Sequence, residues 1–354
     1  MDAIAVPAGG GAPALTTMER PTPGPDEALV RVLRVGIDGT DHEILSGEHG
    51  EPPAGADRLV LGHEAVGVVA HSNAAGLSPG TVVVPMVRRP PPSGSNQYFE
   101  RGEPDMAPSG AYVERGIVGA HGYCSSYFTS PAEYLVELPE TLAEFGFLVE
   151  PASITEKALE HALTTRSAFE WEPESALVLG NGSLGLLSTA MIAQRCDRVY
   201  CLGRRDRPDP TIDIIERLGA TYIDSRETAL AEIPRAYEPM DLVYEATGYA
   251  PHAFETIEAL APNGVGALVG VPGDHAFEID GGDLHRALVM ENKALVGSVN
   301  SGRPHFERAI ETLSSLPDWL FDALVTTVAP VESFADAFVN TDETIKTAIE
   351  FETP

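Results

Sequence analysis

The amino-acid sequence predicts a two-domain α/β protein, in which an irregular β domain is joined to a doubly wound parallel sheet. The residues before Glu150 are rich in Gly and Pro, with short β-branched runs between them. After Glu150, apolar strand-like runs alternate with segments of helical periodicity, as in parallel sheets covered by helices. A chain of 354 residues is long enough for two separate hydrophobic cores.

In the first domain, apolar runs separated by turn residues predict short strands, with no long amphipathic helix among them. These strands are expected at residues 29–35, 65–69, 82–87 and 134–138. Residues 88–123 contain three consecutive prolines and several glycines, so we expect a long loop there. Loops of such length in a compact domain are usually functional or clamped by a metal.

In the second domain, helical periodicity begins near Ile154, and strands and helices then alternate. We expect strands at 176–179, 199–202, 242–244, 264–270 and 294–299, and helices at 184–193 and 212–218. The strand-like runs at 324–328 and 345–351 are expected to return to the first domain. The two predicted domains therefore comprise residues 1–153 with 310–354, and residues 154–309.

The chain is strongly acidic, with a formal net charge of −30 from 53 acidic and 23 basic residues. Such a surface repels nucleic acid and anionic membranes, so neither is expected as a partner. Only three of the basic residues are lysines. This composition indicates adaptation to molar salt, where electrostatic screening shortens to about 3 Å and self-repulsion becomes tolerable.

The sequence also predicts a cytoplasmic compartment. Its three cysteines do not make a disulfide framework, and the first residues lack the basic segment of a signal peptide. No stretch of roughly 18 apolar residues is present to span a membrane.

A glycine-rich turn predicts the dinucleotide site. Gly180-Asn181-Gly182-Ser183-Leu184-Gly185 has the spacing G-x-G-x-x-G, with an apolar strand before it and an apolar helix after it. In this motif the first glycine makes the turn and the second lets the pyrophosphate approach the backbone. The third lets helix pack on strand, and the helix N-terminus faces the phosphates.

The end of the next strand indicates which dinucleotide binds. NAD-binding sites place a carboxylate there, but this sequence has Gly203-Arg204-Arg205. Glycine leaves room, and guanidinium groups can pair with a 2′-phosphate through two parallel hydrogen bonds. We therefore expect NADP to be preferred, while Asp206 leaves weaker use of NAD open.

Two glycine-flanked motifs suggest a metal site. The segment Gly62-His63-Glu64-Ala65-Val66-Gly67 and the upstream Gly36-Ile37-Asp38-Gly39-Thr40-Asp41 contain an imidazole and several carboxylates, which are ligands that Zn²⁺ takes. Two simpler interpretations stay open: His63-Glu64 as a surface pair, and Asp38 as a turn residue between glycines. His42 also has an open place in a proton path, because it lies close to Asp38 in sequence.

Gly62-His63-Glu64 followed by Gly67, ahead of Gly76 and Pro79-Gly80, resembles the zinc signature of the medium-chain dehydrogenase/reductase superfamily. Most members carry a ligating cysteine where this chain has Asp38. An aspartate at this position makes the chain similar to the glucose dehydrogenases of halophilic archaea. The chain also resembles that group at residues 203–210, at Leu138-Pro139 and at Glu150-Pro151.

The resemblance implies a GroES-like catalytic domain interrupted by a Rossmann domain. It also implies zinc-dependent oxidation of D-glucose, and of related aldoses, at C1 to the lactone, with hydride transfer to NADP⁺ in non-phosphorylated sugar degradation. The implied zinc ligands are Asp38, His63 and Glu150, with Glu64 beside them, and which of the two glutamates ligates at a given moment is left open. An oxygen ligand at position 38 should bind Zn²⁺ less tightly than a thiolate.

Further roles follow from the same resemblance. Thr40 is expected to relay the proton from the sugar hydroxyl, and Glu64 or Glu150 to accept it. Substrate contacts are expected from Thr40, Glu114, Glu150 and Asn300. The nicotinamide half of the cofactor should be bordered by three pairs of residues, which are Thr247-Gly248, Val271-Pro272 and Val299-Asn300.

Many members hold a second, structural zinc through four closely spaced cysteines, but residues 88–124 contain only Cys124, so no structural zinc is expected. The family usually pairs nucleotide domains through a shared sheet edge, so a homodimer through residues 294–299 is expected. Two alternatives remain open: a zinc-dependent polyol or alcohol dehydrogenase of the same superfamily, and a non-catalytic NADP-binding protein.

Overall fold

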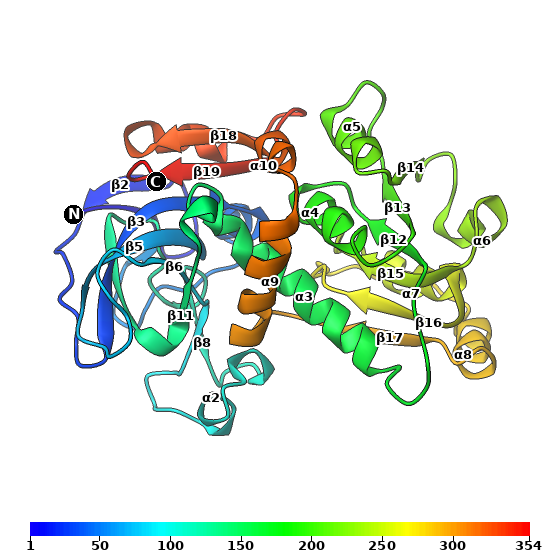
Figure 1. Cartoon of the computed structure of the whole chain (residues 1–354), viewed down its shortest axis with the longest axis horizontal. Helices are drawn as coiled ribbons and strands as arrows, with labels where there is room; N and C mark the ends of the chain where they lie inside the picture. Colours follow the sequence, from blue (N-terminus) through cyan, green and yellow to red (C-terminus); the bar gives the residue numbers. More distant parts are fainter. The chain divides into compact units, whose positions relative to one another are not determined.

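The computed structural model describes all 354 residues and divides into two compact units (Figure 1). Unit 1 comprises Met1–Ser153, Asn300–Ser315 and Val325–Pro354, and unit 2 comprises Ile154–Val299 and Leu316–Leu324. The chain thus re-enters unit 1 at Asn300 rather than at residue 310, and Leu316–Leu324 groups with unit 2. The predicted domain boundaries stay a prediction.

Unit 1 is built from three β-sheets. A seven-stranded sheet has the order β11-β6-β5-β3-β19-β18 with β10 added onto β3, and two three-stranded sheets have the orders β2-β1-β4 and β7-β8-β9. Because β19 pairs antiparallel with β3, the C-terminal segment belongs to this unit. The strands are β1 (Asp2–Pro7), β2 (Ala14–Thr17), β3 (Glu27–Ile37), β4 (Arg58–Val60), β5 (Glu64–Ser72), β6 (Val82–Pro85), β7 (Arg88–Arg89), β8 (Val113–Arg115), β9 (Gly119–Ala120), β10 (Tyr127–Pro131), β11 (Leu135–Glu137), β18 (Val325–Pro330) and β19 (Lys346–Glu350).

The helices of unit 1 are short. They are α1 (Gly39–Ser46), α2 (Gln97–Glu100), α9 (Arg303–Ser315), the first turn of α3 (Val149–Thr164), and the 3₁₀ segments η1 (Pro104–Met106), η2 (Ala132–Tyr134), η3 (Glu140–Leu142), η4 (Gly146–Leu148) and η6 (Val331–Phe338). The prediction of a plain loop at 88–123 was wrong, since α2, η1 and the sheet β7-β8-β9 lie within it. These elements are too short to produce a periodic pattern.

Unit 2 contains a six-stranded, wholly parallel sheet of order β14-β13-β12-β15-β16-β17. Every residue of β12 is buried, which explains the continuous apolar run that predicted it. The strands are β12 (Ser175–Leu179), β13 (Arg198–Gly203), β14 (Thr221–Asp224), β15 (Met240–Glu245), β16 (Leu260–Leu268) and β17 (Ala294–Gly297). The helical segments are α4 (Ser183–Ile192), α5 (Pro210–Arg217), η5 (Leu230–Glu232), α6 (Ile233–Ala236), α7 (Ala250–Ala259), α8 (Gly281–Met290) and α10 (Asp318–Leu324), together with the remainder of α3. The predicted α/β fold class is confirmed.

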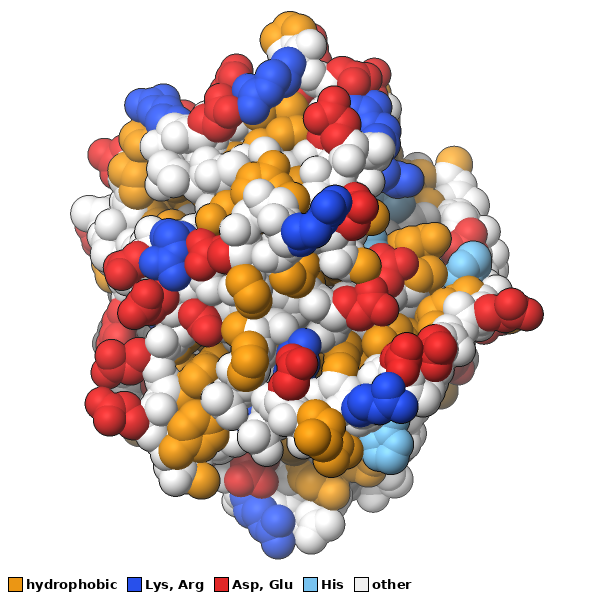
Figure 2. Space-filling view, turned by 90° about the vertical axis from the view of Figure 1, so that its right-hand side faces the viewer, with side chains coloured by type: hydrophobic (Ala, Val, Ile, Leu, Met, Phe, Trp, Pro, Cys, Tyr) orange, Lys and Arg blue, Asp and Glu red, His pale blue; other side chains and the backbone are white.

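The molecular surface mixes charges at short range. Figure 2 shows acidic side chains interspersed with hydrophobic and basic ones over one face, without a continuous basic stripe. Surface arginines of unit 2 pair with carboxylates: Arg198 with Glu238 and Arg226 with Asp224. None of the helices is both long enough and apolar enough to cross a membrane.

Candidate metal and dinucleotide sites

The candidate metal ligands come together because two strands of unit 1 are antiparallel neighbours. Asp38 directly follows β3, and His63 directly precedes β5, while the register of this pair sets Gly36 opposite Glu64. His63 Nε2 consequently lies 3.4 Å from Asp38 Oδ2. Gly62 adopts a φ of 86°, and a Cβ there would lie 2.6 Å from Cys124 Sγ, so only glycine fits before His63.

Asp38 also has a local structural role, as the open interpretation of a turn residue had suggested. It is the N-cap of α1: its Oδ1 accepts from the backbone N–H of Asp41 at 3.1 Å, and Asp41 Oδ2 accepts from the backbone N–H of Asp38 at 3.2 Å. This reciprocal capping box holds one carboxylate oxygen of Asp38 and leaves the other facing His63. Turn residue and candidate ligand are therefore compatible roles.

Two overlapping donor sets share His63. The ligand atoms of Asp38, Asp41 and His63 lie within 4.8 Å of one another, and so do those of His63, Glu64 and Glu150. Glu150 reaches the cluster from the first turn of α3 and is 8 % exposed. The buried His63 Nδ1 has no hydrogen-bond partner. A set of carboxylate oxygens and imidazole nitrogen, with one buried ring nitrogen unpaired, fits a divalent cation such as Zn²⁺.

Burial and mutual repulsion perturb the protonation of this cluster. Burial raises the pKa of Glu150 to about 8, with the Glu64 and Asp38 carboxylates adding to the rise against an opposing effect of His63. Burial and the Asp38 carboxylate raise the pKa of Asp41 to about 7. Burial alone would raise the pKa of Asp38, but His63 and Lys346 outweigh it and hold that pKa below its usual range. A bound dication would offset the same repulsion.

The expected substrate residues occupy separate elements of unit 1. Thr40 is half-buried in the first turn of α1, where Asp38 and Asp41, not its hydroxyl, make the cap. Glu114 lies in β8 with its side chain 14 % exposed. Asn300 has a φ of 56°, and its buried Oδ1 has no hydrogen-bond partner. An unpaired buried amide oxygen is costly and is available to a ligand's donor.

The glycine-rich turn of unit 2 has the geometry of a pyrophosphate cradle. Gly180 follows β12 with a φ of 107°, and Gly182 is the N-cap of α4, which begins at Ser183 and Leu184. A Cβ on Gly185 would lie 1.9 Å from Gly180 O, so the third glycine permits the close packing of helix on strand. The N–H groups at the start of α4 are left to bind an anion.

The end of β13 carries the residues that were expected to distinguish NADP from NAD. A Cβ on Gly203 would lie 2.5 Å from Asn181 Oδ1, which is held in place by a hydrogen bond from Asn181 Nδ2 to Thr211. Arg204 is exposed and forms no ion pair, whereas Arg205 Nε lies 3.9 Å from Asp209. Asp206 is the carboxylate that left weaker use of NAD open, and it forms an ion pair with Arg226 at 2.7 Å.

The later strand ends bring two further expected cofactor segments together. At the end of β15, Glu245 Oε1 accepts from the backbone N–H groups of Thr247 and Gly248. A Cβ on Gly248 would lie 2.7 Å from Val271 O, so the loop with Val271-Pro272 approaches this turn closely. Val299 is exposed, and its carbonyl accepts from Lys157 Nζ at 3.0 Å.

Comparison with known proteins matches this arrangement. The domain described as "Glucose dehydrogenase C-terminus" matches residues 143–351, and the one described as "Alcohol dehydrogenase GroES-like domain" matches residues 24–140. A glucose 1-dehydrogenase of Haloterrigena turkmenica is 62 % identical, and the match covers 99 % of each chain. The chain belongs to the glucose dehydrogenase family.

Among solved structures, glucose dehydrogenase of Haloferax mediterranei in complex with NADP, Zn and gluconolactone has a TM-score of 0.98. It is 61 % identical and the match covers 100 % of both chains. More distant structures share the fold: a 2R,3R-butanediol dehydrogenase of Bacillus subtilis, 21 % identical, has a TM-score of 0.80 and is covered to 99 % on each chain. The predicted resemblance is confirmed.

Two residues that were not predicted there belong to or contact the candidate metal cluster. Asp41 is fully buried, and its Oδ1 has no hydrogen-bond partner. Lys346 of β19 forms an ion pair with Glu64, with 2.5 Å between Nζ and Oε2. The three-residue spacing from Asp38 is a capping-box signal that could have revealed Asp41. No local pattern connects Lys346 with Glu64.

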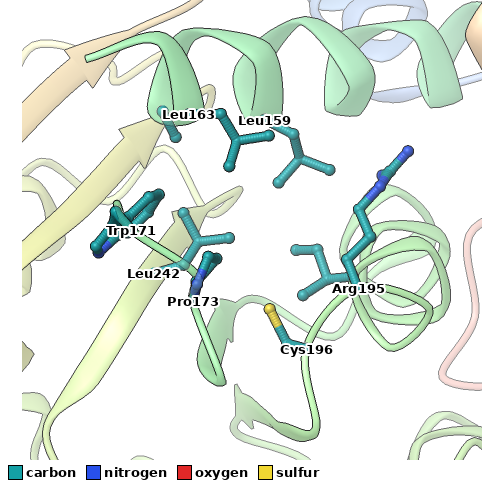
Figure 3. A pocket seen from close by; sticks show the side chains of 9 residues that line it. Leu159, Leu163, Trp171, Pro173, Arg195, Cys196 and Leu242 are labelled. Atoms are coloured by element: carbon teal, nitrogen blue, oxygen red, sulfur yellow. The ribbon is translucent and has the colours of Figure 1, made fainter. Parts of the chain in front are cut away.

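Unit 2 also contains a separate apolar cavity of about 330 Å³. Leu159 and Leu163 of α3 face Trp171 and Cys196 across it (Figure 3). Pro173 and Cys196 precede β12 and β13, so the cavity lies at the amino ends of the strands, whereas the glycine turn lies at the carboxyl ends. Ligands of doubly wound sheets bind at the carboxyl ends.

Proposed function

We propose that this chain is a zinc-dependent dehydrogenase that oxidises D-glucose at C1 to the lactone and transfers the hydride to NADP⁺. The cluster of Asp38, His63, Glu64 and Glu150 carries the proposal because it contains the donors of a zinc site. These residues belong to two groups that share His63, and within each group the ligand atoms lie within 4.8 Å of one another. The 61 % identity over the full chain to an enzyme solved with NADP, Zn and gluconolactone supports it.

Asp38, His63 and Glu150 would hold the zinc, with Glu64 beside it. When bound, zinc supplies a Lewis acid that polarises the sugar hydroxyl, and NADP⁺ supplies the hydride acceptor. Thr40 Oγ1 relays the hydroxyl proton. The Thr40 side chain is available for this role because Asp38 and Asp41 make the cap of α1. Glu150 or Glu64 receives that proton.

The remaining proposed residues bind and orient. The turn Gly180-Asn181-Gly182 and the start of α4 hold the pyrophosphate, while Arg204 and Arg205 bind the 2′-phosphate. The segments Thr247-Gly248, Val271-Pro272 and Val299-Asn300 border the nicotinamide. Glu114 accepts a hydrogen bond from a sugar hydroxyl, and the Asn300 amide accepts from or donates to another. Such paired polar contacts reject a sugar lacking one hydroxyl far more strongly than an apolar pocket does.

A homodimer through the edge of the parallel sheet remains part of the proposal. β17 is an edge strand, and Met290 and Val289, which lie just before it, are 73 % and 62 % exposed. An edge strand beside exposed apolar side chains suits pairing with a second copy. The cytoplasmic compartment stays a prediction.

The test is the initial rate of NADP⁺ reduction with D-glucose in molar KCl, before and after EDTA treatment. Wild type should be active, should lose activity on chelation and should recover it with Zn²⁺. Asp38→Ala should be inactive. Glu43→Ala is the matched control, because Glu43 is an exposed carboxylate on the same helix, and it should retain activity.

The outcomes separate the alternatives. Activity that survives EDTA and Asp38→Ala would remove the metal assignment. Faster turnover of sorbitol than of D-glucose would move the function to a polyol dehydrogenase of the same fold. Binding of NADP⁺ without turnover of any sugar or polyol would identify a non-catalytic nucleotide-binding protein.

A further inference from the structure

A buried arginine contacts the expected sugar-binding carboxylate. Arg88 of β7 lies directly opposite Glu114 of β8 in the antiparallel register, and its Nε donates to Glu114 Oε1 at 2.9 Å. Arg88 is 2 % exposed, whereas the Glu114 side chain is 14 % exposed. Since Arg88 engages Oε1, Glu114 Oε2 is left to accept from a ligand.

The guanidinium of Arg88 is itself fixed by its surroundings. Its Nη1 donates to Asp105 O at 2.9 Å and to Ala107 O at 3.3 Å. Its Cζ lies 3.6 Å from the centroid of the Tyr112 ring, which is a cation–π contact. Hydrogen bonds at the edge and an aromatic ring beneath the plane leave the group little rotational freedom, so it is preorganised to hold Glu114.

The strand that carries Glu114 lies against the turn that carries His63. A Cβ on Gly116, two residues after Glu114, would lie 2.3 Å from Gly62 O. Further along, Tyr123 N donates to Gly62 O at 2.9 Å. These close backbone approaches place β8 beside the metal cluster within unit 1. A carboxylate held at this position is suited to bind a hydroxyl of a substrate whose reacting carbon faces the metal.

We propose that Arg88 is a positioning residue for the sugar: it holds Glu114 in the orientation in which Oε2 accepts from one glucose hydroxyl. The proposal rests on the proposed function and adds a specificity role to it. Without Arg88, Glu114 keeps its charge but loses its fixed rotamer, so the enzyme binds glucose less well while the reacting groups around His63 are unchanged.

Arg89 provides a matched control, since it is the adjacent residue, is 9 % exposed and is also a buried guanidinium over an aromatic ring. Its hydrogen bonds go to Met86 O, Arg88 O, Tyr123 and Ser130, with none to Glu114. Arg88→Met and Arg89→Met therefore remove the same group at similar burial, and only Arg88→Met releases Glu114.

The experiment compares KM and kcat for D-glucose and KM for NADP⁺ in wild type, Arg88→Met, Arg89→Met and Glu114→Gln, with the unfolding midpoint of each. We expect Arg88→Met to raise KM for glucose by about ten- to hundred-fold, with kcat and KM for NADP⁺ changing far less. In the Glu114→Gln background, Arg88→Met should add little. Tyr112→Leu, which keeps Arg88 and removes the ring beneath it, should raise the same KM less, and serves if Arg88→Met does not fold.

A panel of monodeoxyglucoses gives a readout that general destabilisation would not move. The analogue that lacks the hydroxyl bound by Glu114 should show the same KM with wild type and Arg88→Met, while the other analogues show the increase. Equal effects of Arg88→Met and Arg89→Met on every sugar would overturn the role of Arg88 alone. A wild type inactive on all aldoses would overturn the proposed function and this role with it.

Discussion

Replacing Lys346 by Met should destabilise the protein strongly, because it leaves the Glu64 carboxylate buried without its cation. The two side chains are each 2 % exposed and their charged atoms are 2.5 Å apart. Removing one partner of a buried ion pair typically costs about 3–5 kcal/mol, and the near-complete burial of both groups places Lys346→Met in that range.

The loss should depend on pH. Burial raises the pKa of Glu64 even with Lys346 present, and without that ammonium the pKa rises further. A carboxyl whose folded pKa exceeds its unfolded value contributes stability at low pH and loses it as pH rises. Lys346→Met should therefore be closest to wild type near pH 5 and furthest from it near pH 8.

The assay is urea unfolding in molar KCl with EDTA, so that both proteins are metal-free. Molar KCl shortens the Debye length to about 3 Å, but salt screens a buried ion pair much less than an exposed one. Lys346→Met/Glu64→Gln should recover much of the loss. Lys293→Met is the control, since its carboxylate partner Glu291 is 45 % exposed, and it should cost less. A loss below about 1 kcal/mol for Lys346→Met, or one independent of pH, would refute the reasoning.

Three further predictions concern the two sites. Asp38→Asn should keep the cap of α1, and so stay within about 1 kcal/mol of wild-type stability, but it should lose most of its affinity for zinc. Unfolding curves check the stability and zinc titration checks the affinity, and an unchanged affinity would exclude Asp38 as a ligand. Arg204→Ala should raise KM for NADP⁺ by about ten- to hundred-fold and leave KM for NAD⁺ nearly unchanged, and a parallel rise in both would mean that Arg204 does not bind the 2′-phosphate. The affinity of the metal-free protein for zinc should rise with pH above 6, because Asp41 and Glu150, with pKa values of about 7 and 8, must lose their protons when zinc binds. Calorimetry in buffers of different ionisation enthalpy should show this proton release, and binding heats that do not depend on the buffer would contradict it.

The features that the sequence predicted correctly are those with a local signal. Strand β12, the glycine turn at Gly180 and helix α4 follow one another without interruption, so apolar runs and glycine spacing were sufficient to place them. Glu150 was singled out only through the resemblance. Its place in the cluster depends on the first turn of α3, which begins at Val149, before the periodic segment expected from Ile154.

The features that the sequence did not reveal depend on strand register. Arg88 meets Glu114 because β7 and β8 are antiparallel partners, and each of these strands is too short to show alternation. Helix α1 has eight residues and weak amphipathicity, so its capping box was not recognised. Pairing between distant segments is set by the packed sheet and leaves no mark on neighbouring residues.

Lysine was nevertheless a usable signal for Lys346. The chain has three lysines, and the Lys157 residue is 2 % exposed, Lys346 is 3 % exposed and the Lys293 side chain is 5 % exposed. Each ammonium donates to or pairs with a fixed oxygen: Val299 O, Glu64 and Ile257 O. A compact ammonium fits such positions, where the planar fork of arginine would need more room. In a chain whose surface carries carboxylates in place of lysines, the few remaining lysines are expected to be buried cations. A buried lysine needs a nearby acceptor or carboxylate, and for Lys346 that partner is Glu64 of the candidate metal cluster.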